Sequence, residues 1–159
     1  GISNINIDVV MKEQKNESVN MFYKKMRNYS SINLLWKNNA IDKLYKALAN
    51  NRFIGLASDQ NAGKSGYMSN FFNKTSSFPK GAAIFHYQTK CKVFILFSIL
   101  GNDYKYRIIL KEINLKKSNE QEIISELNDF YIQYLEKKII QFPEQYFWFH
   151  KKWDISNYR

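Results

Sequence analysis

The loop at residues 59–66, Asp-Gln-Asn-Ala-Gly-Lys-Ser-Gly, carries the residue types best suited to chemistry. Backbone N–H groups of a glycine-bearing loop can bind an anion, and Lys64 can place a positive charge beside a phosphate. The apolar run at residues 53–57 precedes the loop and predicts a buried strand that delivers it to a sheet edge. The first chemistry that this loop indicates is therefore phosphate binding.

The same loop nearly matches the nucleotide-binding P-loop, which needs Gly, four residues and then Gly-Lys-Ser/Thr. Ser58 stands where the leading glycine belongs, and Asp59 would place a negative charge beside nucleotide phosphates. A P-loop also runs straight into a helix, whereas residues 66–79 are rich in Asn, Gly, Ser, Thr and Pro. These departures count against nucleotide hydrolysis, which stays an alternative.

The tail at residues 143–153 reads Pro-Glu-Gln-Tyr-Phe-Trp-Phe-His-Lys-Lys-Trp. Together, the loop and the tail resemble the lipid A biosynthesis acyltransferases, the lauroyl/myristoyl transferase family. That family has an Asp-Gln-x-x-Gly-x-x-Gly loop after a strand, and a Pro-Glu-Gln tail that continues through Trp, His, two basic residues and Trp. An aromatic pair at residues 71–72 and Pro-Lys-Gly at residues 79–81 extend the resemblance over nearly the whole chain.

The resemblance implies a substrate-binding site in which Lys12, Lys37 and Lys64 contact the acceptor and Lys64 meets a phosphate on its sugar. Lys12 and Lys37 stand where the family has arginine, so each keeps the charge but loses the bidentate fork. A solvated surface lysine is the alternative at each position. Gly63 and Gly66 are expected to take positive φ angles. The candidate site residues are Lys12, Asn16, Lys37, Asp59, Gln60, Gly63 and Lys64.

The family's catalytic motif, His followed by four residues and then Asp or Glu, does not occur in this chain. The histidines are His86 and His150, and the residues five positions later are Cys91 and Ile155. We expect a packing or surface role for His86 and a structural hydrogen bond for His150. The resemblance then implies that residues 1–159 are the C-terminal part of a single acyltransferase domain, inactive alone, with its catalytic motif upstream of Gly1.

The resemblance also implies a reaction: transfer of a fatty acyl chain from acyl carrier protein to a hydroxyl of a lipid A precursor in lipopolysaccharide biosynthesis. No metal and no organic cofactor are expected. The expected partners are the acidic carrier protein, an anionic lipid acceptor and the inner-membrane surface, on its cytoplasmic face in Gram-negative bacteria. The aromatic tail with Lys151 and Lys152 suits either a membrane-interface belt or a packed segment; packing is expected for Trp148 and left open for Trp153.

The composition is strongly basic, with 24 Lys and Arg against 14 Asp and Glu and a formal net charge of +10. Such a charge favours polyanionic partners, so a basic nucleic-acid-binding module is the main alternative function. It lacks a motif for groove or base readout, and we expect no nucleic-acid partner. Cys91 is the single cysteine, which excludes a disulfide within the chain. No apolar run approaches the ~20 residues of a membrane span.

Periodicity predicts an α/β fold, with a mostly parallel mixed sheet flanked by helices. The resemblance implies that this is the fold of the glycerolipid acyltransferases, truncated at its N-terminus. The predicted strands are residues 4–10, 32–36, 52–58, 92–100 and 104–112, the last two joined as a hairpin around residues 101–103. The predicted helices are residues 17–29, 40–48 with Asn39 as cap, 80–87, and a long one after a Ser118–Gln121 capping box. Residues 59–79 are predicted to be one long loop.

Overall fold

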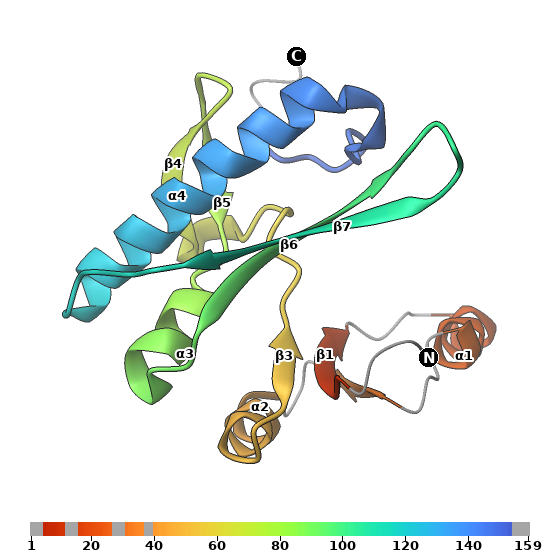
Figure 1. The fold of residues 1–159 in the computed structure, drawn as a ribbon, viewed down its shortest axis with the longest axis horizontal. Helices are drawn as coiled ribbons and strands as arrows, with labels where there is room; N and C mark the ends of the chain where they lie inside the picture. Colours follow the sequence, from red (N-terminus) through yellow and green to blue (C-terminus); the bar gives the residue numbers. More distant parts are fainter. Residues whose placement is uncertain (1–4, 12–15, 27–30, 37–39, 154–159) are drawn as a thin grey trace. The chain divides into compact units, whose positions relative to one another are not determined.

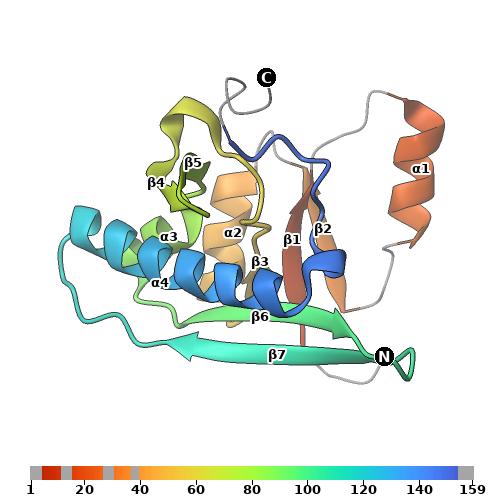
Figure 2. The ribbon, with the colours of Figure 1, turned by 90° about the horizontal axis from the view of Figure 1, so that it is seen from above.

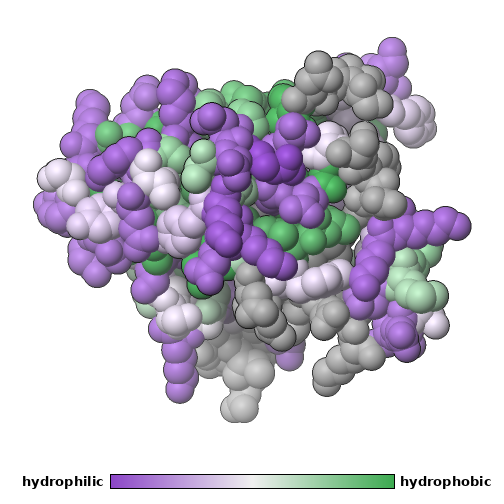
Figure 3. Space-filling view, turned by 90° about the horizontal axis from the view of Figure 1, so that it is seen from below, coloured by the Kyte–Doolittle hydropathy of each residue, from purple (hydrophilic) through white to green (hydrophobic). Residues whose placement is uncertain are grey.

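The structure is a computed structural model that describes residues 5–11, 16–26, 31–36 and 40–153 (Figure 1). These residues belong to two compact units, Gly1–Ala57 and Ser58–Arg159, and each is described by itself. On the face drawn in Figure 3, hydrophilic residues cover most of the described surface. This agrees with a sequence in which 24% of the residues are charged.

The first unit is built on a three-stranded parallel sheet with the strand order β2-β1-β3. Ile7 in the central strand pairs with Ile32 on one side and with Phe53 on the other. Two successive β-helix-β passages produce this sheet, as the hydrophobic periodicity predicts. The elements are β1 (Ile7–Met11), α1 (Glu17–Met26), β2 (Ile32–Trp36), α2 (Ala40–Ala49) and β3 (Phe53–Gly55).

A buried ion pair lies in the middle of this sheet. Asp8 is only 2% exposed, and its two carboxylate oxygens accept hydrogen bonds from Arg52, at 2.7 Å from Nε and 3.1 Å from Nη2. The guanidinium lowers the pKa of Asp8, and burial opposes this effect. A bidentate arginine satisfies both oxygens at once, so Arg52 ties the start of β3 to the central strand.

The second unit consists of two antiparallel hairpins and two helices. β4 pairs with β5, and β6 pairs with β7 over their full lengths. The elements are a 3₁₀ turn η1 (Gly63–Ser65), β4 (Tyr67–Phe71), β5 (Lys74–Phe78), α3 (Gly81–Thr89), β6 (Val93–Leu100), β7 (Tyr106–Ile113), α4 (Glu120–Gln141) and a second 3₁₀ turn η2 (Pro143–Gln145).

Helix α4 organises the core of this unit. It runs along the β6–β7 ribbon in both ribbon views (Figures 1 and 2). Its first half packs Ile123 and Leu127 with Ile95 of β6. Its second half packs Ile132, Leu135 and Ile139 with Phe71 and Phe78 of the first hairpin. The helix therefore connects the two hairpins, and one end of it reaches the segment that carries the tail.

The structure corrects several expectations about the elements. The described strands form three small sheets, and two of these are antiparallel, so a single mostly parallel sheet is not found among them. The region predicted as one loop contains the β4–β5 hairpin, whose turn residues Phe72 and Asn73 both have positive φ angles. Such a turn suits the right-handed twist of paired strands, but neither residue is the glycine by which it is usually recognised.

Two element boundaries also differ from the prediction. The strand predicted at residues 52–58 is shorter, since β3 covers Phe53–Gly55. The long helix is capped by Asn119, whose side chain accepts a hydrogen bond from the Glu122 N–H at 2.9 Å, and the expected Ser118–Gln121 box is wrong by one residue. Asn, like Ser, is a good N-cap, so sequence alone could not separate the two. The predicted cap Asn39 lies outside the described residues.

Candidate functional site

The loop at residues 59–66 is held in shape by its own side chains and by β5. Asn61 Oδ1 accepts a hydrogen bond from the Gly63 N–H at 2.7 Å, and the Gly63 carbonyl accepts one from Ser77 Oγ at 2.6 Å. Gly63 has φ +69°, as predicted. The loop ends in the short turn η1 and then enters β4. Because no helix follows the loop, the geometry that a P-loop needs is absent, and that alternative is wrong.

Gly66 is required for a different reason from the predicted one. Its φ is −76°, so the expectation of a positive angle is wrong here. A Cβ at this position would lie 2.0 Å from Ser77 Oγ and 2.8 Å from the Phe78 carbonyl oxygen. The glycine therefore permits close approach of the loop to β5, where a side chain would push the two apart.

The tail holds the loop from the other side, across almost ninety residues of sequence. The Asn61 N–H donates a hydrogen bond to His150 Nε2 at 2.8 Å, and Asn61 Nδ2 donates one to the Lys152 carbonyl at 2.9 Å. Since Nε2 accepts, neutral His150 carries its proton on Nδ1. The expected structural hydrogen bond of His150 is thus confirmed, and its partner is the candidate loop itself.

Lys152 is the residue that sequence reasoning missed. The sequence left the tail either as a membrane-interface belt or as a packed segment, and it gave no sign that Lys152 itself is buried, with 1% of its surface exposed. Its ammonium donates hydrogen bonds to the carbonyls of Gln60 at 3.1 Å and Ser77 at 3.3 Å, and lies 3.6 Å from the centroid of the Phe78 ring. No local pattern distinguishes such a lysine from Lys151 beside it, which is exposed.

The charge of Lys152 is countered by Asp59. Burial lowers the pKa of Lys152 to about 8, and the Asp59 carboxylate acts against that shift. Burial also raises the pKa of Tyr131, with the same carboxylate as the second cause. Asp59 therefore serves the interior of the unit as a counter-ion, because an unpaired buried ammonium would be strongly destabilising.

The rest of the tail fastens the segment to both hairpins. The Gln145 side chain exchanges two hydrogen bonds with the backbone of Leu100 at the end of β6, at 2.8 and 2.9 Å. Trp153 stacks on Phe71 and donates its indole N–H to the Phe71 carbonyl at 2.9 Å. Trp153, left open by the sequence, is a packing residue. Trp148 was expected to be packed: one face of its ring packs on Phe72, and 45% of the residue stays exposed.

The predicted loop residues divide into structural and outward-facing groups. Asp59 is half-buried and faces Lys152, whereas Gln60 is exposed and contributes its carbonyl to that lysine. Lys64 is exposed on η1, and its ammonium makes no hydrogen bond or ion pair with the described residues. Lys64 is therefore the one predicted lysine whose charge the described structure leaves available to a ligand.

The predicted residues of the first unit are less informative. The side-chain oxygen of Asn16 accepts a hydrogen bond from the Val19 N–H at 3.1 Å, which caps α1. Lys12 and Lys37 lie outside the described residues and stay predictions. The strand residues before them, Met11 and Trp36, are paired neighbours in the sheet.

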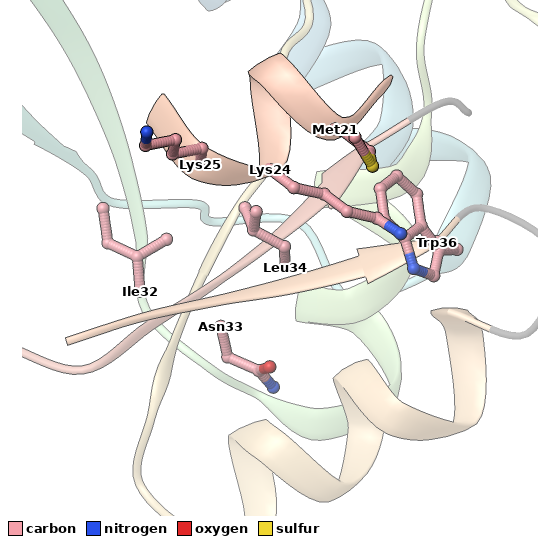
Figure 4. Close-up of a pocket in the computed structure, with 7 residues that line it drawn as sticks. All are labelled: Met21, Lys24, Lys25, Ile32, Asn33, Leu34 and Trp36. Carbon is pink, nitrogen blue, oxygen red and sulfur yellow. The ribbon is translucent and has the colours of Figure 1, made fainter. Parts of the chain in front are cut away.

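A shallow groove of about 560 Å³ lies between α1 and β2 (Figure 4). Trp36 and Leu34 provide an apolar wall, and the Lys24 ammonium lies 5.0 Å from the centroid of the Trp36 ring. Figure 4 shows Lys24 and Met21 directed toward Trp36, with Lys25 further along α1. An apolar wall with a cationic rim is suited to an amphiphile that carries a negative charge.

Both histidines make a hydrogen bond with the backbone of the second unit. His86 Nδ1 lies 2.7 Å from the Cys91 carbonyl, so that nitrogen donates to a fixed acceptor. His150 Nε2 accepts from Asn61, as described above. His86 is half-buried, which agrees with the expected packing or surface role. Among the described residues, no helix is long and apolar enough to cross a bilayer.

Comparison with known protein families shows which family the chain belongs to. The family described as bacterial lipid A biosynthesis acyltransferase matches residues 4–154. This chain belongs to that family. The match includes the loop and the whole tail to Trp153, the two segments that the structure joins through His150 and Lys152. No curated protein matches the chain.

Membership of this family implies an acyltransferase of lipid A synthesis. The carrier-protein donor, the membrane location and the site residues are finer questions than family membership answers.

Proposed function

We propose that this chain forms the acceptor-binding part of an enzyme that transfers a fatty acyl chain from acyl carrier protein to a hydroxyl of a phosphorylated lipid A precursor. The observation that carries the proposal is the exposed, unpaired Lys64, held on a loop that the family's own tail fixes in place. A phosphate on the acceptor would supply a negatively charged partner for the Lys64 ammonium.

The reaction joins two substrates without a metal or an organic cofactor. The acceptor hydroxyl attacks the thioester carbonyl, a new ester bond forms, and the carbon–sulfur bond breaks to release the thiol of the carrier protein. A general base takes the hydroxyl proton. We assign this base to a His-x4-Asp/Glu motif outside residues 1–159, because the residues five positions after His86 and His150 are not acidic.

The donor and the acceptor are both anionic, which a cationic protein surface favours at either entrance. The groove of the first unit supports the same proposal, because the wall formed by Leu34 and Trp36 suits an acyl chain and Lys24 suits a phosphate. The reaction belongs at the cytoplasmic face of the inner membrane, where a lipid acceptor and a soluble carrier protein can meet.

Binding rather than turnover tests the proposal with this chain. The probe is a bisphosphorylated glucosamine-disaccharide glycolipid in non-ionic detergent, and the comparison is the same glycolipid after removal of its phosphates. We expect affinity to fall at least fivefold without the phosphates and by about fivefold in Lys64→Gln, as for the loss of one solvent-exposed ion pair. Lys117→Gln, another exposed lysine of the second unit, should leave affinity unchanged.

Two results would contradict the proposal. One is equal affinity for the phosphorylated and dephosphorylated glycolipids. The other is an equal loss of affinity in Lys64→Gln and Lys117→Gln, since a general charge effect would then explain binding without a site at the loop.

A further inference from the structure

The turn at residues 146–151 of the second unit is held by hydrogen bonds within it and on either side of it. The Trp148 N–H donates to the Tyr146 carbonyl at 3.0 Å, and the His150 N–H donates to the Phe147 carbonyl at 3.4 Å. Before the turn, Gln145 is fixed to the backbone of Leu100. After it, His150 and Lys152 are fixed to the loop at residues 59–66. The conformation of the turn is therefore set by contacts at both ends.

This fixed turn presents aromatic rings to the outside. Phe149 is 91% exposed, Phe147 is 59% exposed and Trp148 is 45% exposed. The rings of Phe147 and Phe149 have centroids 5.9 Å apart, so they form one patch and are not scattered side chains. A phenylalanine has no polar atom to satisfy in water, and exposed apolar residues gathered in a patch mark an interaction surface.

The other aromatic residues of the tail show that exposure is a property of this turn. Trp153, two residues beyond Lys151, is stacked against Phe71, and its indole N–H is hydrogen-bonded. Trp148 donates its indole N–H to the Pro143 carbonyl at 2.7 Å, so its outer face is apolar as well. The chain thus places its hydrogen-bonded indoles against protein and leaves two phenyl rings outside.

Two exposed lysines lie near the patch. Lys151 ends the turn and is exposed. The contact between Trp148 and Phe72, at 6.4 Å between centroids, places the turn beside the β4–β5 hairpin, whose next strand begins with the exposed Lys74. Two carboxylates are close by in sequence: Glu144, which accepts a hydrogen bond from Gln145 at 3.3 Å, and Asp154, which lies outside the described residues. A third, the half-buried Glu136, accepts a hydrogen bond from the Phe72 N–H at 2.6 Å. Apolar rings with lysines at their edge complement an anionic lipid surface.

We propose that the turn at residues 146–151 is a lipid-docking element. Phe147 and Phe149 enter the headgroup region of an anionic bilayer, and Lys151 meets the lipid phosphates. The contacts of Gln145, His150 and Lys152 keep the rings projected without the ordering cost that a flexible segment would incur on binding. This inference is independent of the acceptor site, because it concerns bulk lipid and not the substrate.

Vesicle sedimentation tests the proposal with the whole chain and no acceptor glycolipid. The vesicles contain equal parts of phosphatidylcholine and phosphatidylglycerol, and the comparison vesicles contain phosphatidylcholine alone. We expect binding to the anionic vesicles, weakened by salt, and a loss of partitioning of about tenfold to a hundredfold in the double variant Phe147→Ser/Phe149→Ser. Lys151→Gln should lose about fivefold on anionic vesicles only.

The matched control removes two other exposed apolar side chains from the same unit. Ile108 and Leu110 on β7 are each 60% exposed, and Ile108→Ser/Leu110→Ser should leave partitioning within twofold of the wild type. An equal loss in this control would overturn the proposal in favour of general hydrophobicity. Absence of binding to anionic vesicles would also overturn it. So would a concentration-dependent dimer that the Phe147→Ser/Phe149→Ser variant abolishes, because a second copy would then cover the patch.

The phenylalanine variants should fold, because both rings lie largely in solvent, and their unfolding midpoints give the check. If the double variant is destabilised, the proposal is tested instead by the vesicle binding of Lys151→Gln and by the salt dependence of binding. Equal binding of Lys151→Gln and wild type to anionic vesicles at low salt would then contradict the proposal.

Discussion

Lys152 offers the sharpest prediction, because a buried ammonium couples stability to pH. Its pKa is lowered from 10.5 to about 8, mainly by burial. Between these two values the unfolded chain keeps the proton and the folded chain releases it, so stability rises with pH across this window. The shift corresponds to ~3 kcal/mol. At neutral pH the folded unit therefore carries this penalty, and it is relieved as the pH approaches 10.5.

The perturbation is Lys152→Met, which replaces the unbranched aliphatic stem with one of similar length, lacks the ammonium and removes its titration. We expect the wild type to gain ~3 kcal/mol of stability relative to Lys152→Met as the pH rises from neutral to about 10.5. The assay is urea unfolding at a series of pH values, followed by tryptophan fluorescence in a Trp36→Phe background, so that Trp148 and Trp153 report on the second unit. Tyrosine titration is common to both proteins and cancels in the difference.

The neighbouring lysine supplies the control. Lys151 is exposed, so Lys151→Met should show a difference from wild type that does not change with pH. A pH-independent difference for Lys152→Met as well would refute the reasoning, since Lys152 would then be solvated and could not fasten the tail to the loop.

Three further predictions concern the loop and the first sheet. Gly66→Ala should lower the free energy of unfolding by about 2 kcal/mol or more, because its Cβ would meet Ser77 and β5. In Gly63→Ala the new Cβ meets no atom, and the variant should lose about 1 kcal/mol because its φ is +69°. Equal losses of stability for the two variants in urea unfolding would contradict this prediction. His150→Phe should cost about 1–3 kcal/mol and speed amide exchange at Asn61, whose N–H loses its acceptor; unchanged exchange there would argue against the tail–loop contact. Asp8 has a lowered pKa, so its contribution is present above its ordinary pKa of 3.8 and lost as acid protonates it; Asp8→Asn should remove part of the acid sensitivity of the first unit in circular dichroism titrations, and an unchanged acid midpoint would count against the ion pair.

The parts of the fold that follow local rules could be predicted. Alternating Ile7 and Val9, together with the helical spacing in α2, give the β-helix-β order of the first unit. The turn residues at 101–103 give the β6–β7 hairpin. The β4–β5 hairpin was not predicted because its turn residues Phe72 and Asn73 adopt positive φ angles and neither is a glycine, the residue that usually indicates such a turn.

The candidate site required long-range contacts that no local pattern contains. Asn61 and His150 are 89 residues apart, and their hydrogen bond depends on how α4 returns the chain to the first hairpin. Lysine is usually exposed, so the burial of Lys152 could be learned only from the carbonyls and the Phe78 ring that surround it. The resemblance identified the two segments, and the structure explains why they occur together: the tail holds the loop.

The central claim is that the loop at residues 59–66, held by the tail, receives the phosphate of the acceptor. Amide chemical shifts recorded during titration with the bisphosphorylated glycolipid test it most directly. We predict that the largest shifts fall on residues 59–66, and that they vanish with the dephosphorylated glycolipid and are reduced in Lys64→Gln. Shifts confined to other parts of the chain, or identical for both glycolipids, would contradict the account.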